Sequence, residues 1–368
     1  MSNATRKDRN ELRKKINELK DYLVRISAPK KYLEIMDEMR PLTTQQRFGL
    51  VFEHHSENIL IGRKTNLVEK TSLRINNGMR MNLLIEGENL VALNILKRKY
   101  RSRIDVICID PPYNTGMDWL NYGDHEYGDN ADSFPHSKWL SFMNNRLRIA
   151  YDLLSKEGIM FINIDEHEIG PLLLLAHQLF KEKNVDVLIW PKTDPRFDVN
   201  RIEKPPRDIK IVHEYILVCF KNRVKTRVNK TFISKQTKDG WVESLTNMET
   251  IIHGLGTTSS AKDEMGELFV NRLIFQTPKP VNLIKELIRF GSKPNSIILD
   301  FFAGSGTTGH ATMDLNKEDG GRRTFILVTN NENNICRRIT YERLKRAIRR
   351  NRYKETLRYY RLASGNTK

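Results

Sequence analysis

The chain has 368 residues, a formal net charge of +17 and a pI of about 9.7. Hydrophobic residues make up 39% of it and charged residues 29%, which is typical of a folded globular protein. No apolar run approaches the ~18 residues of a membrane span, and the charged first residues lack the apolar core of a secretory signal. The positive charge favours a polyanionic partner, above all nucleic acid, although a ribosomal or membrane-surface protein would carry it too.

The three cysteines, Cys108, Cys219 and Cys336, are scattered along the chain. Their spacing matches neither a zinc site nor a disulfide framework. We therefore expect no metal and a reducing, cytoplasmic compartment.

Residues 5–40 have a helical pattern. Apolar residues recur at spacings of three and four, at Leu12, Ile16, Leu19 and Leu23, among charged residues. This periodicity predicts an amphipathic helix. Its apolar face either packs on its own domain or pairs with a partner chain or a second copy.

Residues 83–86 are predicted to form a strand, followed by a glycine turn and a helix from Leu90. Glu88 comes directly after Gly87 at the end of this strand. An acid in that position can receive a ribose hydroxyl or an adenine amine. A carboxylate that only stabilises the start of a helix is the alternative.

The stretch 104–116 organises the rest of the chain. A short, apolar, β-branched run predicts a buried strand, which ends in Asp110, Pro111, Pro112 and Tyr113. The prolines cannot donate backbone hydrogen bonds, so the strand stops there. A carboxylate, bare carbonyls and an aromatic ring at a strand end suit an exocyclic amine on a flat ring. The alternative is a proline-rich turn with an incidental acid.

Helices and strands alternate after this turn. A polar loop over 119–134 precedes a helix over 139–154, a strand over 159–165 and a helix over 171–180. Further strands are predicted over 185–190 and 215–220. This alternation predicts a doubly wound α/β sheet.

Residues 190–265 lose this periodicity and are predicted to be inserted loops with a small subdomain. Basic residues in this region could contact DNA phosphates, or could simply form a solvated face. The candidates are Lys192, Arg196, Arg201, Lys204, Arg207 and Lys210.

The second informative stretch is 296–309. A hydrophobic strand ends in Asp300 and runs through a glycine-rich turn into a helix, with glycines at 304, 306 and 309 in the pattern G-x-G-x-x-G. Such glycines allow tight turning and close approach of the backbone to a ligand. No Lys-Ser/Thr ending follows, which disfavours a phosphate-binding P-loop. The next strand, 324–329, is followed by two asparagines and Glu332.

The C-terminal segment 337–361 is predicted to be a helix rich in arginine and lysine, with interleaved tyrosines. Such a helix either binds a phosphate backbone or covers the sheet as a solvated terminal helix.

Two of these motifs carry a family resemblance. Asp110-Pro111-Pro112-Tyr113 resembles the D-P-P-Y signature of DNA adenine amino-methyltransferases, and the segment from Asp300 to Thr308 resembles their F-x-G-x-G cofactor motif. The catalytic motif comes first, which is the order of the β group of these enzymes. With residues 47–53 and 326–332, the pair is similar to the modification (Mod) subunit of Type III restriction-modification systems, over most of 45–362.

The resemblance implies a Rossmann-like, S-adenosylmethionine-dependent methyltransferase fold of the α/β class. It implies a mixed seven-stranded sheet with helices on both faces, an N-terminal helix and a small inserted recognition region. The corresponding segments are an N-terminal helical segment (1–44), a methyltransferase domain (45–190 and 266–336), an inserted basic region (191–265) and a basic C-terminal helix (337–368).

The resemblance also implies roles for single residues. Lys279-Pro280, after Thr277, is similar to a motif that helps to hold the methionine part of the cofactor. Gly87-Glu88 stands where the family has Gly-Asp. The implied catalytic residues are Asp110, Pro111, Pro112 and Tyr113. The implied cofactor-binding residues are Asp300, Phe301, Phe302, Ala303, Gly304, Gly306, Thr307, Thr308, Lys279, Glu88 and Glu332.

We therefore expect a site-specific DNA methyltransferase that methylates N6 of a flipped-out adenine in double-stranded DNA. A homodimer and a restriction (nuclease/helicase) subunit are the further candidate partners. Two alternatives remain at this point. One is cytosine-N4 methylation, which needs the same handling of the amine lone pair. The other is a non-catalytic DNA-binding or assembly subunit that retains the fold.

Overall fold

The structure is a computed structural model, and it describes residues 6–36, 52–57, 59, 65–78, 80–116, 135–193, 209–238 and 240–364. The chain separates into two compact units, Met1–Val51 and Phe52–Lys368. No helix of the described part is both long and apolar enough to cross a membrane.

The first unit contains helix α1 (Arg6–Arg25) and a second helical segment over residues 30–36. The single helix expected over 5–40 is therefore interrupted. Ser27 has a left-handed φ of 53°, and Pro29 cannot supply the amide hydrogen that a continuing helix needs. The residues of 5–40 before Arg6 and after Met36 lie outside the described residues.

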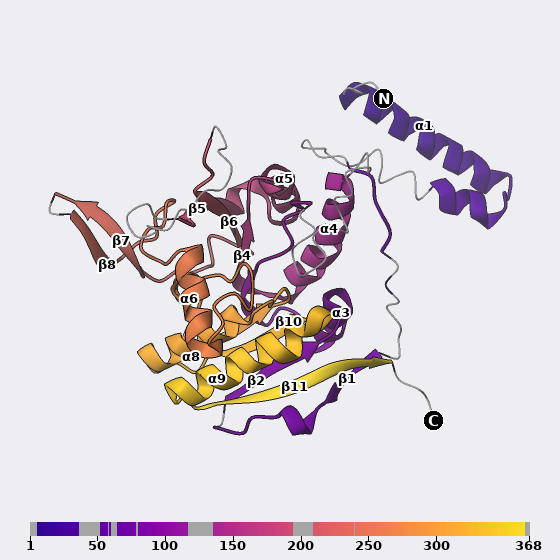
Figure 1. Cartoon of the computed structure of the whole chain (residues 1–368). Coiled ribbons are helices and arrows are strands. Elements are labelled where there is room, and N and C mark those ends of the chain that lie inside the picture. Colours follow the sequence, from indigo (N-terminus) through magenta and orange to yellow (C-terminus); the bar gives the residue numbers. More distant parts are fainter. Residues whose placement is uncertain are drawn as a thin grey trace. The chain divides into compact units, whose positions relative to one another are not determined.

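The second unit is built on one mixed sheet (Figure 1). Within the described residues it has nine strands rather than the expected seven, because β1 and β11 extend the edge beside β2. The six strands from β11 to β4 run parallel, and β1 and β6 are antiparallel to their neighbours. In spatial order the strands are β1 (Thr65–Glu69), β11 (Glu355–Ser364), β2 (Arg80–Glu86), β10 (Thr324–Thr329), β9 (Ile297–Asp300), β3 (Ile104–Ile109), β4 (Leu154–Ile164), β6 (His213–Phe220) and β5 (Val185–Pro191).

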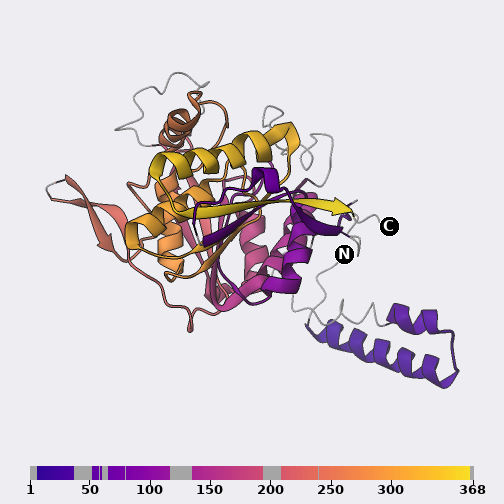
Figure 2. The same ribbon diagram turned by 90° about the horizontal axis from the view of Figure 1, so that it is seen from below.

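Helices cover both faces of the sheet (Figure 2). Alternate residues of β3 show the two layers: Val106 and Cys108 belong to a core cluster with Leu287, whereas Ile107 and Ile109 are buried outside that cluster. One layer contains α3 (Asn89–Tyr100), α4 (Pro135–Leu153) and α5 (Ile169–Phe180). The other contains α7 (Val281–Gly291), α8 (Thr307–Asp319) and α9 (Tyr341–Asn351), with α6 (Thr258–Phe269) against α9.

Short helical turns join these elements. They are η1 (Thr71–Leu73), η3 (Glu182–Asn184), η4 (Glu332–Asn334) and the π-helical η5 (Ile335–Thr340). The expected C-terminal helix is wrong beyond Asn351, because residues from Glu355 onward form strand β11. Leu357 and Tyr359 are buried, while their neighbours Arg358 and Tyr360 are only half-buried. This alternation has the period of a strand, and it was obscured by the many arginines and tyrosines.

The inserted region contains a two-stranded hairpin, β7 (Thr231–Thr237) and β8 (Gly240–Thr246). The hairpin projects away from the sheet in both views (Figures 1 and 2). It is joined to the sheet by backbone hydrogen bonds through residues 250–253, for example from the amide of Ile189 to the carbonyl of Thr250 at 2.7 Å.

The order in which the strands are connected changes direction between β3 and β9, although the two strands themselves run parallel. The connection after β3 passes through α4 to β4 on one side, and the connection after β9 passes through α8 to β10 on the other. The two strands are parallel neighbours, with Ile107 paired to Leu299. In open α/β sheets, ligands bind at such a point, outside the carboxyl ends of the strands. The two sequence motifs follow these two strands.

Candidate active site

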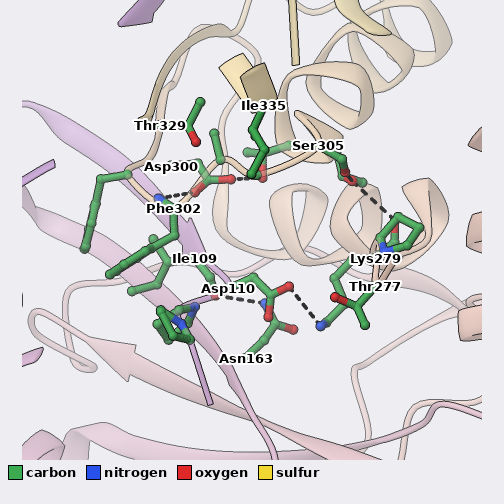
Figure 3. Close-up of a pocket in the computed structure, with 18 of the residues that line it drawn as sticks. Ile109, Asp110, Asn163, Thr277, Lys279, Asp300, Phe302, Ser305, Thr329 and Ile335 are labelled. Atoms are coloured by element: carbon green, nitrogen blue, oxygen red, sulfur yellow. Dashed lines mark hydrogen bonds and ion pairs between the residues drawn. The ribbon is translucent and has the colours of Figure 1, made fainter. Parts of the chain in front are cut away.

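A cavity of about 370 Å³ lies at the carboxyl ends of β3 and β9 (Figure 3). This volume is in the range of small-molecule sites. Both motifs line it, together with the segment 277–279 before α7 and residues that follow β2, β4 and β10. The segments carrying the two motifs, far apart in sequence, therefore share one cavity.

The end of β3 is held in place by two side chains from neighbouring elements. Asn163 of β4 donates its amide to the carbonyl of Ile109 at 2.9 Å, and Trp139 of α4 donates its indole N–H to the carbonyl of Pro112 at 2.7 Å. Asn163 and Trp139 are both buried. The Pro-Pro turn is thus fixed from two directions, which positions Asp110 and Tyr113.

Asp110, Tyr113, Lys279 and Glu214 form one hydrogen-bonded group. The Tyr113 hydroxyl donates to Oδ1 of Asp110 at 2.6 Å, and Nζ of Lys279 lies 2.9 Å from Oδ2. Nζ also lies 2.8 Å from the Tyr113 hydroxyl. Glu214 Oε2 is 3.2 Å from both Lys279 Nζ and the Tyr113 hydroxyl. Lys279, which we expected to bind the cofactor, lines the cavity that both motifs share, and its ammonium contacts the D-P-P-Y motif.

Burial and charge act in opposite directions on the two carboxyl groups. Burial raises the pKa of Asp110, with Lys279 acting against it and Glu214 adding to it. For Glu214, burial is outweighed by Lys279 and Lys192, so its pKa is lowered. Burial and the Asp110 charge raise the pKa of Tyr113 well above its usual value, so Tyr113 keeps its proton and acts as a donor.

Glu214 was not among the residues predicted from the sequence, although its position carries a signal. It is the second residue of β6, which runs antiparallel to β4 with Tyr215 paired to Ile164. Where a strand runs antiparallel to its neighbour, its first residues lie beside the last residues of that neighbour. The first residues of β6 therefore lie beside the carboxyl end of β4. Acids at that position should therefore be examined together with those that end parallel strands.

The glycine-rich turn after β9 is organised by Asp300. Its carboxylate accepts from the Phe302 amide at 2.9 Å and from the Thr308 hydroxyl at 2.6 Å. Burial raises the pKa of Asp300 to about 7, and these two hydrogen bonds only partly oppose this effect. Asp300 therefore ties the start of the turn to the first residues of α8.

Gly304 and Gly306 have positive φ angles of 45° and 82°, which glycine adopts without steric cost. A Cβ on Gly306 would lie 3.0 Å from Cγ2 of Thr340. The Thr340 hydroxyl donates to the carbonyl of Gly304 at 2.6 Å. The turn is thus packed closely against η5 and leaves its other side to the cavity.

A buried arginine supports this turn from behind. Arg343 of α9 donates to the hydroxyls of Ser305 at 2.9 Å and Thr307 at 2.7 Å. Its guanidinium is 3.8 Å from Glu264 Oε2, and Glu264 in turn accepts from the Val281 amide at the start of α7. Burial lowers the pKa of Arg343 to about 10, which leaves it charged at neutral pH.

The other two acids that were expected to bind the cofactor, Glu88 and Glu332, differ in their surroundings. Glu88 accepts from the Leu90 amide at 3.1 Å and pairs with Arg146 at 2.8 Å, so it caps α3 as the alternative interpretation held. It also lines the cavity. Glu332, in η4, is exposed and lines the cavity beside Asn330.

The structure brings most of the predicted site residues together. Lys192 follows β5, lines the cavity and lies 3.5 Å from Glu214 Oε1. Lys210 is exposed and is not part of the cavity lining. Arg196, Arg201, Lys204 and Arg207 lie outside the described residues. The predicted residues in the lining are Asp110, Pro111, Pro112, Tyr113, Asp300, Phe301, Phe302, Ala303, Gly304, Thr307, Thr308, Lys279, Glu88, Glu332 and Lys192.

The fold and the site together define a class of protein. It is a doubly wound α/β protein in which two strands, each ending in a motif, meet at one cavity. A family model described as DNA methylase (N6_N4_Mtase) matches residues 104–342, which is more than half of the chain. The chain belongs to this DNA methylase family.

Individual relatives support the same assignment. The chain is 31% identical over 347 residues to the StyLTI Mod subunit of a Type III restriction-modification enzyme from Salmonella typhimurium strain LT2, covering 67% of this chain and 52% of that protein. It is 26% identical over 378 residues to the EcoPI Mod subunit of Escherichia phage P1, covering 68% and 58%. It is 26% identical over 339 residues to the Type II methyltransferase M.KpnI of Klebsiella pneumoniae, covering 67% and 79%. The chain thus spans little more than half the length of these two Mod subunits.

Proposed function

We propose that this protein transfers a methyl group from S-adenosylmethionine to N6 of an adenine flipped out of double-stranded DNA. The observation that carries the proposal is the convergence of Asp110 with Gly304 and Ser305 of the glycine-rich turn on one cavity. Membership of the DNA methylase family supports DNA as the substrate. The Mod-subunit relatives support a role as the modification component of a restriction-modification system.

The cavity residues fit the cofactor. Gly304 and Ser305 of the turn line the cavity, and Phe302 and Ile335 offer an apolar wall for a flat ring. Glu332 offers an exposed carboxylate to ribose hydroxyls. When bound, S-adenosylmethionine supplies an electrophilic methyl group on its sulfonium sulfur.

The residues after β3 act on the target amine. With the cofactor bound, the N6 lone pair would form the new N–C bond as the methyl–sulfur bond breaks, and the proton lost from N6 would pass to solvent by way of the Asp110 carboxylate that accepts its hydrogen bond. Asp110 and the Pro111 carbonyl accept hydrogen bonds from the amine, which localises its lone pair and stabilises the positive charge that develops there. Tyr113 offers its ring for stacking, worth ~1–3 kcal/mol per base.

The inserted region 191–265 is proposed to contact the DNA. Lys210 is exposed there, and the β7–β8 hairpin projects from the sheet. Backbone contacts of this kind hold the duplex while the target base is unstacked. The domain limits derived from the sequence, with the methyltransferase domain over 45–190 and 266–336, are part of the same proposal.

We further propose a cytoplasmic protein that assembles with a restriction subunit, and with a second copy of itself. Cys108, Cys219 and Cys336 are buried free thiols, which suits a reducing compartment. The relatives named as Mod subunits support a restriction partner.

Mass spectrometry of nucleosides tests the reaction. Unmethylated genomic DNA treated with the protein and S-adenosylmethionine should yield N6-methyladenine. N4-methylcytosine instead would assign the other amine, and neither product, with no S-adenosylmethionine bound in calorimetry, would overturn the proposal in favour of a non-catalytic subunit. Asp rather than Ser before Pro-Pro-Tyr favours adenine.

A further inference from the structure

We propose that Glu214 is a positioning residue of this site, which draws Lys279 partly away from Asp110 and fixes the ring of Tyr113. The inference rests on the proposed methyl transfer, since it assigns a role within that reaction. The role explains how the Asp110 carboxylate can still accept a hydrogen bond from the target amine although Lys279 already contacts this carboxylate.

The geometry is a closed set of contacts around three side chains. Tyr113 and Lys279 each donate to a different oxygen of Asp110, at 2.6 and 2.9 Å. The same two donor atoms both lie 3.2 Å from Glu214 Oε2. Glu214 therefore contacts both of the groups that bind Asp110.

Burial strengthens the electrostatic interactions in this group of side chains. The side chains of Lys279 and Glu214 are only 7% and 11% exposed, whereas that of Asp110 is 31% exposed. Charges in a poorly solvated site interact strongly and need partners. The ammonium of Lys279 is held deep in the site, while part of the Asp110 carboxylate remains open to an incoming amine.

Charge balance explains why a second carboxylate is needed. Methyl transfer creates positive charge on the amine, which an ionised Asp110 stabilises. A lysine paired with Asp110 alone would neutralise this carboxylate and repel the developing cation. Because Glu214 is a second acceptor for the Lys279 ammonium, at 3.2 Å, this cation is not bound by Asp110 alone, while Lys192, 3.5 Å from Glu214, limits the negative charge that Glu214 adds.

The same contact fixes the aromatic ring. The Tyr113 hydroxyl is bonded to Asp110, to Glu214 and to Lys279. Three partners at one end of the side chain limit rotation of the ring. Its face is thereby held in one orientation for stacking with the base.

Glu214 and Lys279 have opposite effects on Asp110, which gives the proposal a distinctive test. Glu214 raises the pKa of Asp110 and Lys279 lowers it, while burial raises it most. The other ionisable groups around this cluster are Tyr113, Lys192, Cys108, Asp300 and Asp165.

The experiment measures methyl transfer from tritiated S-adenosylmethionine to unmethylated genomic DNA as a function of pH. The acidic limb of kcat/KM reports the ionisation of Asp110 in the free enzyme. We expect Glu214→Gln to shift this limb to lower pH, by about one unit, and to lower kcat at the plateau. Lys279→Met should shift the limb to higher pH. Glu214→Asp should recover part of the lost kcat.

Glu318→Gln is the matched control, because Glu318 also lies 3.2 Å from a lysine, Lys285, but does not line the cavity. This variant should leave the limb in place. A loss of rate in Glu214→Gln without a shift of the limb would indicate a merely structural role and overturn the proposal. If Glu214→Gln fails to fold, Glu214→Ala, which also removes the carboxylate, takes its place in the comparison with Lys279→Met.

A second measurement separates this inference from the proposed function. The infrared band of protonated carboxyl groups, taken as a difference between each protein and its Asp110→Asn version, reports the ionisation of Asp110 without cofactor or DNA. Opposite shifts in Glu214→Gln and Lys279→Met support the charge balance even if the wild type methylates no DNA. Methylation by the wild type without these opposite shifts would overturn the inference alone.

Discussion

Asp110 and Asp300 end neighbouring parallel strands and line the same cavity, so that the charge of Asp110 contributes to the raised pKa of Asp300. The two carboxylates accept hydrogen bonds from different donors. Lys279 and Tyr113 donate to Asp110, whereas the Thr308 hydroxyl and the Phe302 amide donate to Asp300. Two buried acids in one cavity thus have different environments, and we assign them different tasks. In the proposed reaction, Asp110 faces the amine to be methylated, and Asp300 shapes the turn next to the cofactor.

Replacement of Asp110 by asparagine should reduce methyl transfer by roughly 100-fold or more, because the developing positive charge loses its carboxylate. Binding of S-adenosylmethionine should be essentially unchanged. Tritium transfer and calorimetry measure the two quantities. Asp152→Asn, which removes an acid from a surface ion pair with Lys97, serves as the control. Retained activity in Asp110→Asn would remove Asp110 from the mechanism.

The raised pKa of Asp300 predicts a pH dependence of stability. Its pKa rises from 3.8 to about 7 in the folded protein, so the folded state binds a proton that the unfolded state releases between these values. The associated stability is fully present below pH ~4 and is lost as the pH rises towards 7.

Urea unfolding at several pH values tests this dependence. The difference in unfolding free energy between wild type and Asp300→Asn should fall by a few kcal/mol from pH ~4 to ~7, at about 1.4 kcal/mol per pKa unit. A difference that does not change over this range would show that Asp300 is ionised throughout. The asparagine can still accept from the Phe302 amide, so the turn should remain intact.

Gly306→Ala should lower the free energy of unfolding by more than the cost of placing an alanine in the left-handed conformation. The new methyl group would lie 3.0 Å from Thr340 Cγ2, at a contact that also holds the cofactor turn. Gly320→Ala is the matched control, since Gly320 has a φ of 69° and no atom within 4 Å of the added Cβ.

We expect Gly320→Ala to cost about 1 kcal/mol and Gly306→Ala about 1 kcal/mol more. Thermal and urea unfolding measure both values. In addition, only Gly306→Ala should weaken the binding of S-adenosylmethionine. Equal effects of the two substitutions on stability and on cofactor affinity would contradict the close packing of the turn.

DNA affinity should fall steeply with salt concentration, because phosphate contacts release counterions. Lys210→Ala should reduce the slope of log K against log[salt] by about 1. Lys317→Ala, on α8 outside the inserted region, should leave the slope as it is. Fluorescence anisotropy of a labelled duplex measures both slopes. A flat response between low and moderate salt would speak against phosphate-based binding.

The sequence patterns predicted much of the fold and of the site. The buried strands β3, β4 and β10 were found because β-branched, apolar runs are short and end at proline, glycine or polar residues. Asp110 was singled out because it directly follows such a strand, and Asp300 because it ends one. Strand β11 was missed, because the consecutive residues Arg358, Tyr359, Tyr360 and Arg361 place polar and aromatic side chains on both of its faces and so hide the alternation of a half-buried strand.

The local sequence determined which residues end the strands, where the chain turns tightly, and that the protein carries a large positive charge. These features depend on neighbours along the chain, on backbone sterics and on side-chain size, so they can be deduced from the order of residues. The tertiary structure alone decided that the Lys279 ammonium binds Asp110 and that Glu214 contacts it. Such contacts depend on which strands become neighbours and in which direction they run, and a buried charge is then bound by whichever opposite charge the packing brings within reach.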